Sequence, residues 1–234
     1  MSDIHFTIDG KPCIAQPGQT IVEAANANGV WIPVLCRYEG LKPAGSCRIC
    51  TVRVAGRFMA ACTQPVTEGM AVENEVPDLE DMRKALVEML FVEGNHFCPS
   101  CEKSGNCELQ ALGYRYRLTA PRFPYLWPGR EVDAAAPFLM LEHNRCVQCR
   151  RCVQAVQAKD GRKIFAAVER GGRVSIEVDG PLAAKMTEAE ARAAMDLCPV
   201  GAIIKKRTGF AVPIGKRKYD HEPIGSEVGK GTGR

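Results

Sequence analysis

The feature that most constrains this chain is a run of three cysteines spaced three residues apart, Cys146, Cys149 and Cys152. Three thiolates on little more than one helical turn can hold three corners of an iron–sulfur cube, and a remote Cys-Pro pair supplies the fourth ligand in such sites. Cys198 is followed by proline and provides that pair. Zinc sites more often use paired CxxC motifs. The pattern therefore predicts a [4Fe–4S] cluster held by Cys146, Cys149, Cys152 and Cys198.

A single cluster is expected in this region. The bacterial two-cluster pattern would continue with a cysteine four residues after Cys152, but Val156 stands there. Counting back from Cys198 by the same pattern reaches Ala194, Ala191 and Glu188. Because none of these side chains can replace a thiolate, the pattern leaves no ligands for a second cluster.

Cysteine content, charge and hydropathy exclude several other classes of protein. Disulfide scaffolds are short chains with a higher density of cysteine than this chain, which has 12 cysteines in 234 residues. The N-terminus MSDIHFTIDG is unlike a signal peptide, and apolar stretches such as residues 134–141 are too short to span a bilayer. The net charge of +4 is too small to imply nucleic-acid binding. We expect a cytoplasmic protein without a membrane span or nucleic-acid partner, whose cysteines bind metal.

The first group of cysteines has the spacing Cys36-x10-Cys47-x2-Cys50-x11-Cys62. This spacing resembles the [2Fe–2S] motif of plant-type ferredoxins with its first gap lengthened. Gly45 and Ser46 would place slim backbone N–H donors beside the cluster sulfurs. We therefore expect one [2Fe–2S] cluster here, and a four-cysteine zinc site is the alternative.

Turn and cap signals around this group predict the order of the β-grasp ferredoxin fold. Asp9-Gly10 predicts a hairpin over residues 4–15, and Ala55-Gly56 predicts a second one over residues 51–63. Between them, Thr20 and Glu23 form a capping box for a helix over residues 21–28.

The middle group, His96, Cys98, Cys101 and Cys107, has only three thiolates. It follows a predicted helix over residues 79–94. The one cysteine left over is Cys13, which lies far away in the first predicted hairpin and is best explained as a small apolar strand residue. We therefore expect His96 to be the fourth ligand of a second [4Fe–4S] cluster.

The predicted fold class is α+β with three cluster domains. The chain is divided into a β-grasp [2Fe–2S] ferredoxin-like domain (1–78), a small helical His/Cys [4Fe–4S] domain (79–118), a proline-rich linker (119–137), a ferredoxin-like [4Fe–4S] domain (138–208) and a tail (209–234). The last domain should contain a hairpin around Gly171-Gly172 and a helix over residues 188–197. The tail carries an apolar patch between basic clusters and is expected to dock on a partner.

Three motifs in this order, over residues 1 to about 208, resemble a region shared by three families. These are the large iron–sulfur subunit of respiratory complex I, the N-terminal part of iron-only hydrogenases, and the diaphorase iron–sulfur subunit of soluble NAD-reducing nickel–iron hydrogenases. The families' middle motif usually has three residues between its histidine and first cysteine. Here Gly94 occupies that slot and His96 stands two residues later.

The resemblance is closest to the hydrogenase diaphorase subunit. The stretches EGNHFCPSCEKSGNCELQ and PIGKRKYD look like that subunit, and the chain ends at Arg234, where the other two families would continue into a large domain. The resemblance implies a relay of single electrons between an FMN-containing, NAD(H)-binding diaphorase subunit and the small and large hydrogenase subunits.

Catalytic motifs are missing from this sequence. It has no GxGxxG between a strand and a helix, no P-loop, and no second pair of CxxC motifs to hold nickel. We therefore expect a non-catalytic electron-transfer subunit of an oxidoreductase complex. The alternatives are an equivalent subunit of a complex-I-like NADH dehydrogenase or an NAD-dependent formate dehydrogenase and, more remotely, a zinc-organised interaction protein.

Overall fold

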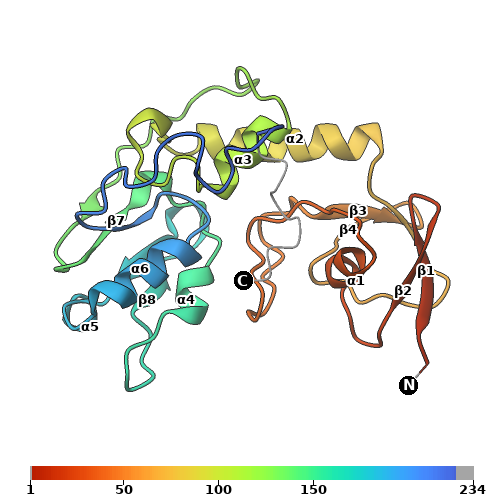
Figure 1. Cartoon of the computed structure of the whole chain (residues 1–234), viewed down its shortest axis with the longest axis horizontal. Coiled ribbons are helices and arrows are strands. Elements are labelled where there is room, and N and C mark those ends of the chain that lie inside the picture. Colours follow the sequence, from red (N-terminus) through yellow and green to blue (C-terminus); the bar gives the residue numbers. More distant parts are fainter. Residues whose placement is uncertain (1, 225–234) are drawn as a thin grey trace. The chain divides into compact units, whose positions relative to one another are not determined.

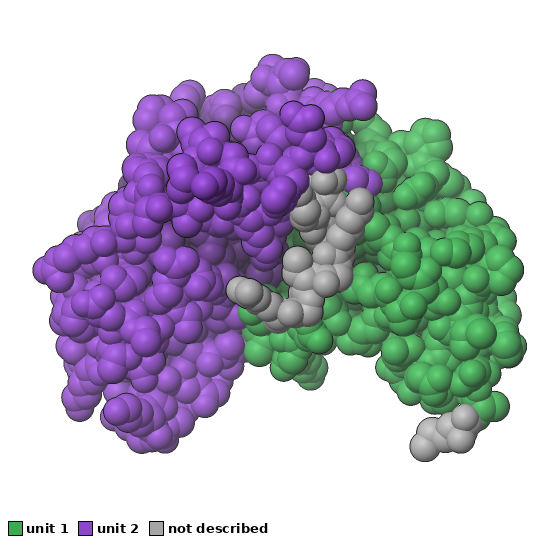
Figure 2. All heavy atoms as spheres, viewed as in Figure 1, with its two compact units in different colours: residues 1–87, 227–234 green, residues 88–226 purple. Residues whose placement is uncertain are grey.

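The computed structural model describes residues 2–224. Within them the chain forms two compact units, residues 2–87 and residues 88–224 (Figure 2). The boundary falls inside the helix α2 (Pro77–Val92) (Figure 1). Both units combine helices with strands, which confirms the α+β class. The linker and C-terminal segments expected from the sequence fall in the second unit, together with residues 88–118 of the expected middle segment. No helix in the described part of the chain is long and apolar enough to cross a membrane.

The first unit is built on a five-stranded mixed sheet with the strand order β2-β1-β5-β3-β4. Both predicted hairpins are present: β1 (Ile4–Ile8) pairs with β2 (Lys11–Ala15), and β3 (Thr51–Val54) pairs with β4 (Arg57–Ala60). The sequence did not predict β5 (Ala71–Glu73), which lies parallel to β1 and antiparallel to β3. This short strand therefore joins the two hairpins into one sheet.

Helix α1 (Ile21–Ala27) begins at the predicted capping box. Thr20 accepts from the Glu23 backbone N–H, and the Glu23 carboxylate accepts from the Thr20 backbone N–H. The buried face of the helix joins the apolar core formed on the sheet, which also contains Phe6, Ile8 and Val52. Burying this face supplies most of the stability of so short a helix.

A buried arginine fixes the start of α2 to the first cysteine region. The Arg83 guanidinium donates to the Asn74 carbonyl at 3.0 Å, to Asn74 Oδ1 at 2.7 Å and to the Thr51 carbonyl at 2.8 Å. Since Thr51 directly follows Cys50, this network holds the backbone at one end of the candidate cluster loop.

The second unit begins with the end of α2 and the middle cysteine region. That region contains a short 3₁₀ turn, η1 (Cys98–Ser100), and the helix α3 (Glu108–Arg115). The proline-rich segment then runs extended along the unit: Leu126 donates to the Val92 carbonyl at 3.0 Å, and β6 (Val132–Asp133) pairs with the next strand.

The rest of the second unit contains two small sheets and three helices. One sheet has the order β10-β7-β6, in which β7 (Leu139–Glu142) is central and β10 (Ile203–Lys205) is an edge strand. The predicted hairpin is β8 (Phe165–Val168) with β9 (Ser175–Val178). The remaining elements are η2 (His143–Arg145), α4 (Arg151–Ala155), η3 (Gly171–Arg173), α5 (Gly180–Ala183) and α6 (Glu188–Leu197). The predicted capping box of Thr187 and Glu190 starts α6.

The predicted tail packs against its own chain over residues 215–220. The Tyr219 N–H donates to the Gly105 carbonyl at 2.9 Å, the Lys218 N–H donates to Asn106 Oδ1 at 3.0 Å, and Tyr219 is only 5% exposed. Arg217 pairs with Asp220 at 2.7 Å. This part of the tail contacts the loop between Cys101 and Cys107, and docking of the tail on a partner stays a prediction. Residues 225–234 of the predicted tail lie outside the described residues.

Candidate iron–sulfur centres

The chain brings its candidate ligands together in three groups, in the combinations that the sequence predicted. Among residues 2–224, no three His, Cys, Asp or Glu side chains converge closely enough to hold a single metal ion. An iron–sulfur cluster distributes its protein ligands over several iron atoms. Each of the three groups offers four candidate donors, the number that such a cluster needs.

The first group lies in loops of the first unit. Cys36 follows α1, Cys47 and Cys50 lie in the loop before β3, and Cys62 follows β4. The Cys47 thiol donates to the Cys36 sulfur, which lowers the pKa of Cys36 and raises the pKa of Cys47. Hydrogen bonding with Cys62 likewise lowers the pKa of Cys50. The four sulfurs therefore form one contiguous group that is able to bind a cluster.

The loop before β3 is shaped by residues with left-handed backbone. Gly45 has φ +63°, and a methyl group on it would lie 3.0 Å from Thr63 Cγ2. Arg48, which directly follows Cys47, also has a positive φ. The Ser46 hydroxyl contacts Cys36, where it helps to lower the pKa of that thiol. The loop thus curls its backbone around the sulfur group, as binding of an anionic cluster requires.

The middle group lines one cavity in the second unit. His96, Cys98, Cys101 and Cys107 all face this cavity, together with Arg145 and Gly201. Cys98 begins η1, and Cys107 caps α3, where its sulfur accepts from the Gln110 N–H at 3.4 Å. A methyl group on Gly201 would lie 2.4 Å from Cys101 Sγ. Any larger residue at position 201 would therefore clash with this sulfur.

The imidazole of His96 has the properties of a neutral ligand. Burial lowers its pKa to about 4, and the charges of Arg145 and Arg130 act in the same direction. The ring also hydrogen-bonds to the Leu90 carbonyl at the end of α2. Metal-binding histidines typically donate one ring N–H to such an outer partner, which leaves the lone pair of the other nitrogen for the metal. The residues present therefore fit a His/Cys₃ donor set.

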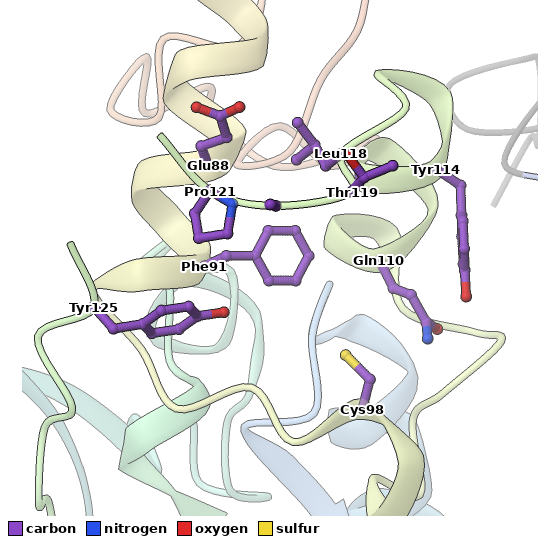
Figure 3. Close-up of a pocket in the computed structure, with 11 residues that line it drawn as sticks. Glu88, Phe91, Cys98, Gln110, Tyr114, Leu118, Thr119, Pro121 and Tyr125 are labelled. Atoms are coloured by element: carbon purple, nitrogen blue, oxygen red, sulfur yellow. The ribbon is translucent and has the colours of Figure 1, made fainter. Parts of the chain in front are cut away.

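A second, apolar cavity of about 230 Å³ lies beside Cys98, between α2 and α3 (Figure 3). Phe91 from α2 and Gln110 and Tyr114 from α3 line it. In Figure 3 the Cys98 sulfur points toward the side of the pocket where the Phe91 ring lies. The side of Cys98 that faces away from the predicted ligands is thus largely apolar, which lowers the dielectric constant around any cluster bound there.

The third group is formed where α4 meets the end of α6. Cys146 and Cys149 lie in the loop before α4, Cys152 lies in that helix, and Cys198 caps the end of α6. The four sulfurs lie close enough for the charge of Cys198 to raise the pKa of each of the other three thiols. Gln148 and Arg150 have positive φ angles of 51° and 60°. These left-handed residues bend the loop that carries Cys146 and Cys149.

Burial disfavours ionisation of the thiols of the second unit. It raises the pKa of Cys107 to about 12, of Cys146 to about 11 and of Cys152 to about 12. Thiolates packed this closely would repel one another in a buried site, so they need a cationic partner. Iron would provide that partner, and the cysteines would lose their protons on binding it.

Sequence reasoning missed the charged residues that connect the middle and C-terminal groups. Lys103, Arg145 and Arg151 are buried or nearly so, and each contacts the other group's segment. The sequence did contain a partial signal for them. All three charged residues lie within or beside cysteine motifs, where small or apolar neighbours are expected. Their partners are distant in sequence and could not be read from spacing.

Family models match most of the described chain. A 2Fe-2S iron-sulfur cluster binding domain matches residues 2–77, the NADH-ubiquinone oxidoreductase-G iron-sulfur binding region matches residues 83–122, and the ferredoxin-like domain of NADH-quinone oxidoreductase subunit 3 matches residues 136–204. These domains are iron–sulfur domains of oxidoreductases. Their order agrees with that of the three ligand groups.

Relatives of known identity fall into two sets. The chain is 32% identical over 215 residues to the mitochondrial NADH-ubiquinone oxidoreductase 78 kDa subunit of Candida albicans, but the match spans only 29% of that protein. It is 49% identical over 222 residues to the NAD-reducing hydrogenase HoxS subunit gamma of Cupriavidus necator, and the match covers 94% of this chain and 95% of the relative.

A solved structure agrees with the second set. One chain of the crystal structure of an NAD⁺-reducing [NiFe]-hydrogenase in the H₂-reduced state superposes with a TM-score of 0.87 and 40% sequence identity, and 94% of both chains is covered. The fold, the ligand groups and the full-length match agree. This chain belongs to the family of the gamma subunits of NAD-reducing hydrogenases.

Proposed function

We propose that this chain relays single electrons between an FMN-containing, NAD(H)-binding diaphorase subunit and the small and large subunits of a hydrogenase. In this role it is a non-catalytic subunit, because hydride transfer and hydrogen activation take place on the partner subunits. The proposal depends above all on one observation: twelve candidate ligands lie in three separate groups within a chain of the hydrogenase gamma family.

The three groups would hold one [2Fe–2S] cluster and two [4Fe–4S] clusters. Cys36, Cys47, Cys50 and Cys62 bind the first, His96, Cys98, Cys101 and Cys107 the second, and Cys146, Cys149, Cys152 and Cys198 the third. Each bound cluster supplies a site that accepts and releases one electron. The protein residues hold it, exclude water and set its potential.

The exposure of the cysteines supports a relay. Within each group one cysteine is half-buried, namely Cys47, Cys98 and Cys146, and the other cysteines are buried. Buried ligands keep water away from a cluster, and a half-buried ligand leaves one edge of it nearer to a neighbouring redox centre. Such an arrangement suits electron transfer and leaves no open position for substrate.

Each of the three clusters would lie in a domain of its own. We propose that residues 1–78 form a β-grasp ferredoxin domain, since two hairpins, one helix and a late central strand surround the first group. The second and third groups belong to a His/Cys domain (79–118) and a ferredoxin-like domain (138–208), connected by the extended segment 119–137 and followed by the tail.

Anaerobic purification with the natural partner subunits tests the proposal. We expect about ten iron atoms per copy of this chain, and separate electron paramagnetic resonance signals for one [2Fe–2S] and two [4Fe–4S] clusters after reduction. Hydrogen should reduce all three in the intact complex, and Cys149→Ser should interrupt NAD⁺ reduction while the hydrogenase subunits still reduce an artificial dye. A colourless chain with about three zinc ions would instead favour the zinc-organised interaction protein.

A further inference from the structure

One arginine reaches from the C-terminal ligand group into the middle one. Arg145 directly precedes Cys146, and its side chain is only 14% exposed. Its Nη1 atom lies 3.5 Å from Cys101 Sγ, 3.5 Å from Glu102 Oε2 and 3.5 Å from the Gly201 carbonyl. A residue of one ligand motif therefore donates to a ligand sulfur of the other.

A second arginine makes a matching connection without touching sulfur. Arg151 directly precedes Cys152 and is 2% exposed. It forms a two-pronged ion pair with Glu108, with distances of 2.8 and 2.6 Å, and also contacts the Leu197 carbonyl at 3.3 Å. In both pairs the arginine lies just before a cysteine of the third group, and the glutamate lies just after a cysteine of the middle group.

Backbone contacts hold the same two segments together. The Glu108 N–H donates to the Pro199 carbonyl at 2.8 Å, beside Cys198. Buried Lys103 donates to the Met195 carbonyl at 2.6 Å, near the end of α6. These contacts and the Arg151–Glu108 pair already fix the two loops. Arg145 is therefore not required for their attachment, and its contact with sulfur needs another explanation.

The physical effect of that contact follows from charge. A cluster becomes more negative when it accepts an electron, so a cation that donates a hydrogen bond to a ligand sulfur stabilises the reduced form more than the oxidised form. Hydrogen bonds to the sulfurs are among the factors that set cluster potentials. Since Arg145 is largely buried, water screens its charge only weakly.

We propose that Arg145 raises the reduction potential of the cluster held by the middle group, and so acts as a positioning residue for electron transfer between the two [4Fe–4S] clusters. This inference rests on the proposed function, because it requires both clusters to be present. It assigns to Arg145 a role distinct from that of Arg151, which holds the two loops in register.

The test is a redox titration of the intact complex, followed by electron paramagnetic resonance. Arg145→Met keeps the length of the side chain and removes its charge and donors; Arg145→Lys keeps the charge but not the fixed fork of donors. Arg150→Met is the matched control, because Arg150 lies in the same motif but is exposed. Iron content is measured for every variant.

We expect Arg145→Met to retain the wild-type iron content and to shift the one-electron equilibrium of the middle cluster at least tenfold toward oxidation, a fall of about 59 mV. Arg145→Lys should give a smaller fall, and the C-terminal cluster and the Arg150→Met variant should keep wild-type potentials. Unchanged potentials in Arg145→Met, or an equal fall in Arg150→Met, would overturn the inference.

Loss of the middle cluster in both Arg145 variants would also overturn the inference, because Arg145 would then be needed to assemble the cluster rather than to set its potential. If the wild-type complex itself lacked the two [4Fe–4S] signals, the proposed function would fail, and that outcome is separate from a failure of the Arg145 inference.

Discussion

A methyl group on Gly94 would lie 2.4 Å from Nε2 of His96, so the imidazole occupies the space that a side chain at position 94 would fill. Position 94 is where the related families usually carry the histidine of this motif. The ring of His96 thus reaches back over two residues of backbone to the slot that Gly94 leaves open. This juxtaposition explains how a shifted histidine can still face Cys98, Cys101 and Cys107.

The first prediction concerns the charge of the middle cluster. Replacing a thiolate with a neutral imidazole makes a cluster less negative by one unit, which raises its potential, as in Rieske centres. His96→Cys, if the shorter side chain reaches iron, should keep about ten iron atoms and lower that cluster's potential. His96→Ala should lose the cluster or leave one corner open. Unchanged resonance signals and potentials in His96→Ala would mean that the fourth ligand lies elsewhere.

The second prediction tests the space beside Gly94. Gly94→Ala should displace the imidazole and reduce the occupancy of the middle cluster, because overpacking of a filled site typically costs about 1–3 kcal/mol. In the His96→Ala background the overlap with the imidazole is removed, but the methyl group would still lie 2.8 Å from the Asn144 carbonyl, so the change should cost less stability without becoming neutral. Thermal unfolding of the four proteins forms a double-mutant cycle. Strictly additive effects would mean that Gly94 and His96 do not interact.

Local signals in the sequence predicted the elements that local interactions stabilise. The capping boxes at Thr20 and Thr187 and the turn at Asp9-Gly10 all stand where they were expected. The cysteine spacings also predicted which sulfurs gather. β5 and β10, with three residues each, carry too little pattern to be recognised and depend on pairing with strands distant in sequence. The Arg145–Cys101 contact spans 44 residues and depends on the tertiary fold.

A third prediction concerns the cysteine outside the groups. Cys13 is 2% exposed in the core of the first unit, where its thiol donates to the Lys11 carbonyl at 3.5 Å. Cys13→Ser should leave the iron content and all resonance signals unchanged and should destabilise the protein by about 1–3 kcal/mol, because a hydroxyl is buried. Cys13→Ala serves as the control for thiol loss alone. A missing cluster in either variant would contradict the assignment of ligands.

A fourth prediction follows from the raised pKa values in the second unit. The pKa of Cys107 is about 12 and that of Cys146 is about 11, so both thiols are protonated near neutral pH. Below such a pKa the thiolate fraction rises tenfold per pH unit, and iron binds the thiolate. The initial rate of anaerobic cluster reconstitution in the cluster-free chain should therefore rise steeply between about pH 7 and pH 9. A flat profile would mean that ionisation of these thiols does not limit loading.

The last prediction separates two roles of the tail. Tyr219 is buried against the loop between Cys101 and Cys107, whereas Ile214 is 83% exposed and contributes to the apolar patch that the sequence predicted to dock on a partner. The Arg217 guanidinium lowers the pKa of Asp220 to about 2, so this ion pair persists at neutral pH and holds the segment in place. Removing the Tyr219 ring should let the segment open locally and expose the cluster loop.

Tyr219→Ala should therefore lose the middle-cluster signal several times faster than wild type in the presence of an iron chelator, while the [2Fe–2S] signal decays at the wild-type rate. Ile214→Ser is the matched control: it should leave both decay rates unchanged and weaken co-purification with the partner subunits, because its side chain contributes to the exposed patch rather than to the packed segment. Equal decay in Tyr219→Ala and wild type would remove the protective role of the tail. Undiminished co-purification of Ile214→Ser would remove its docking role.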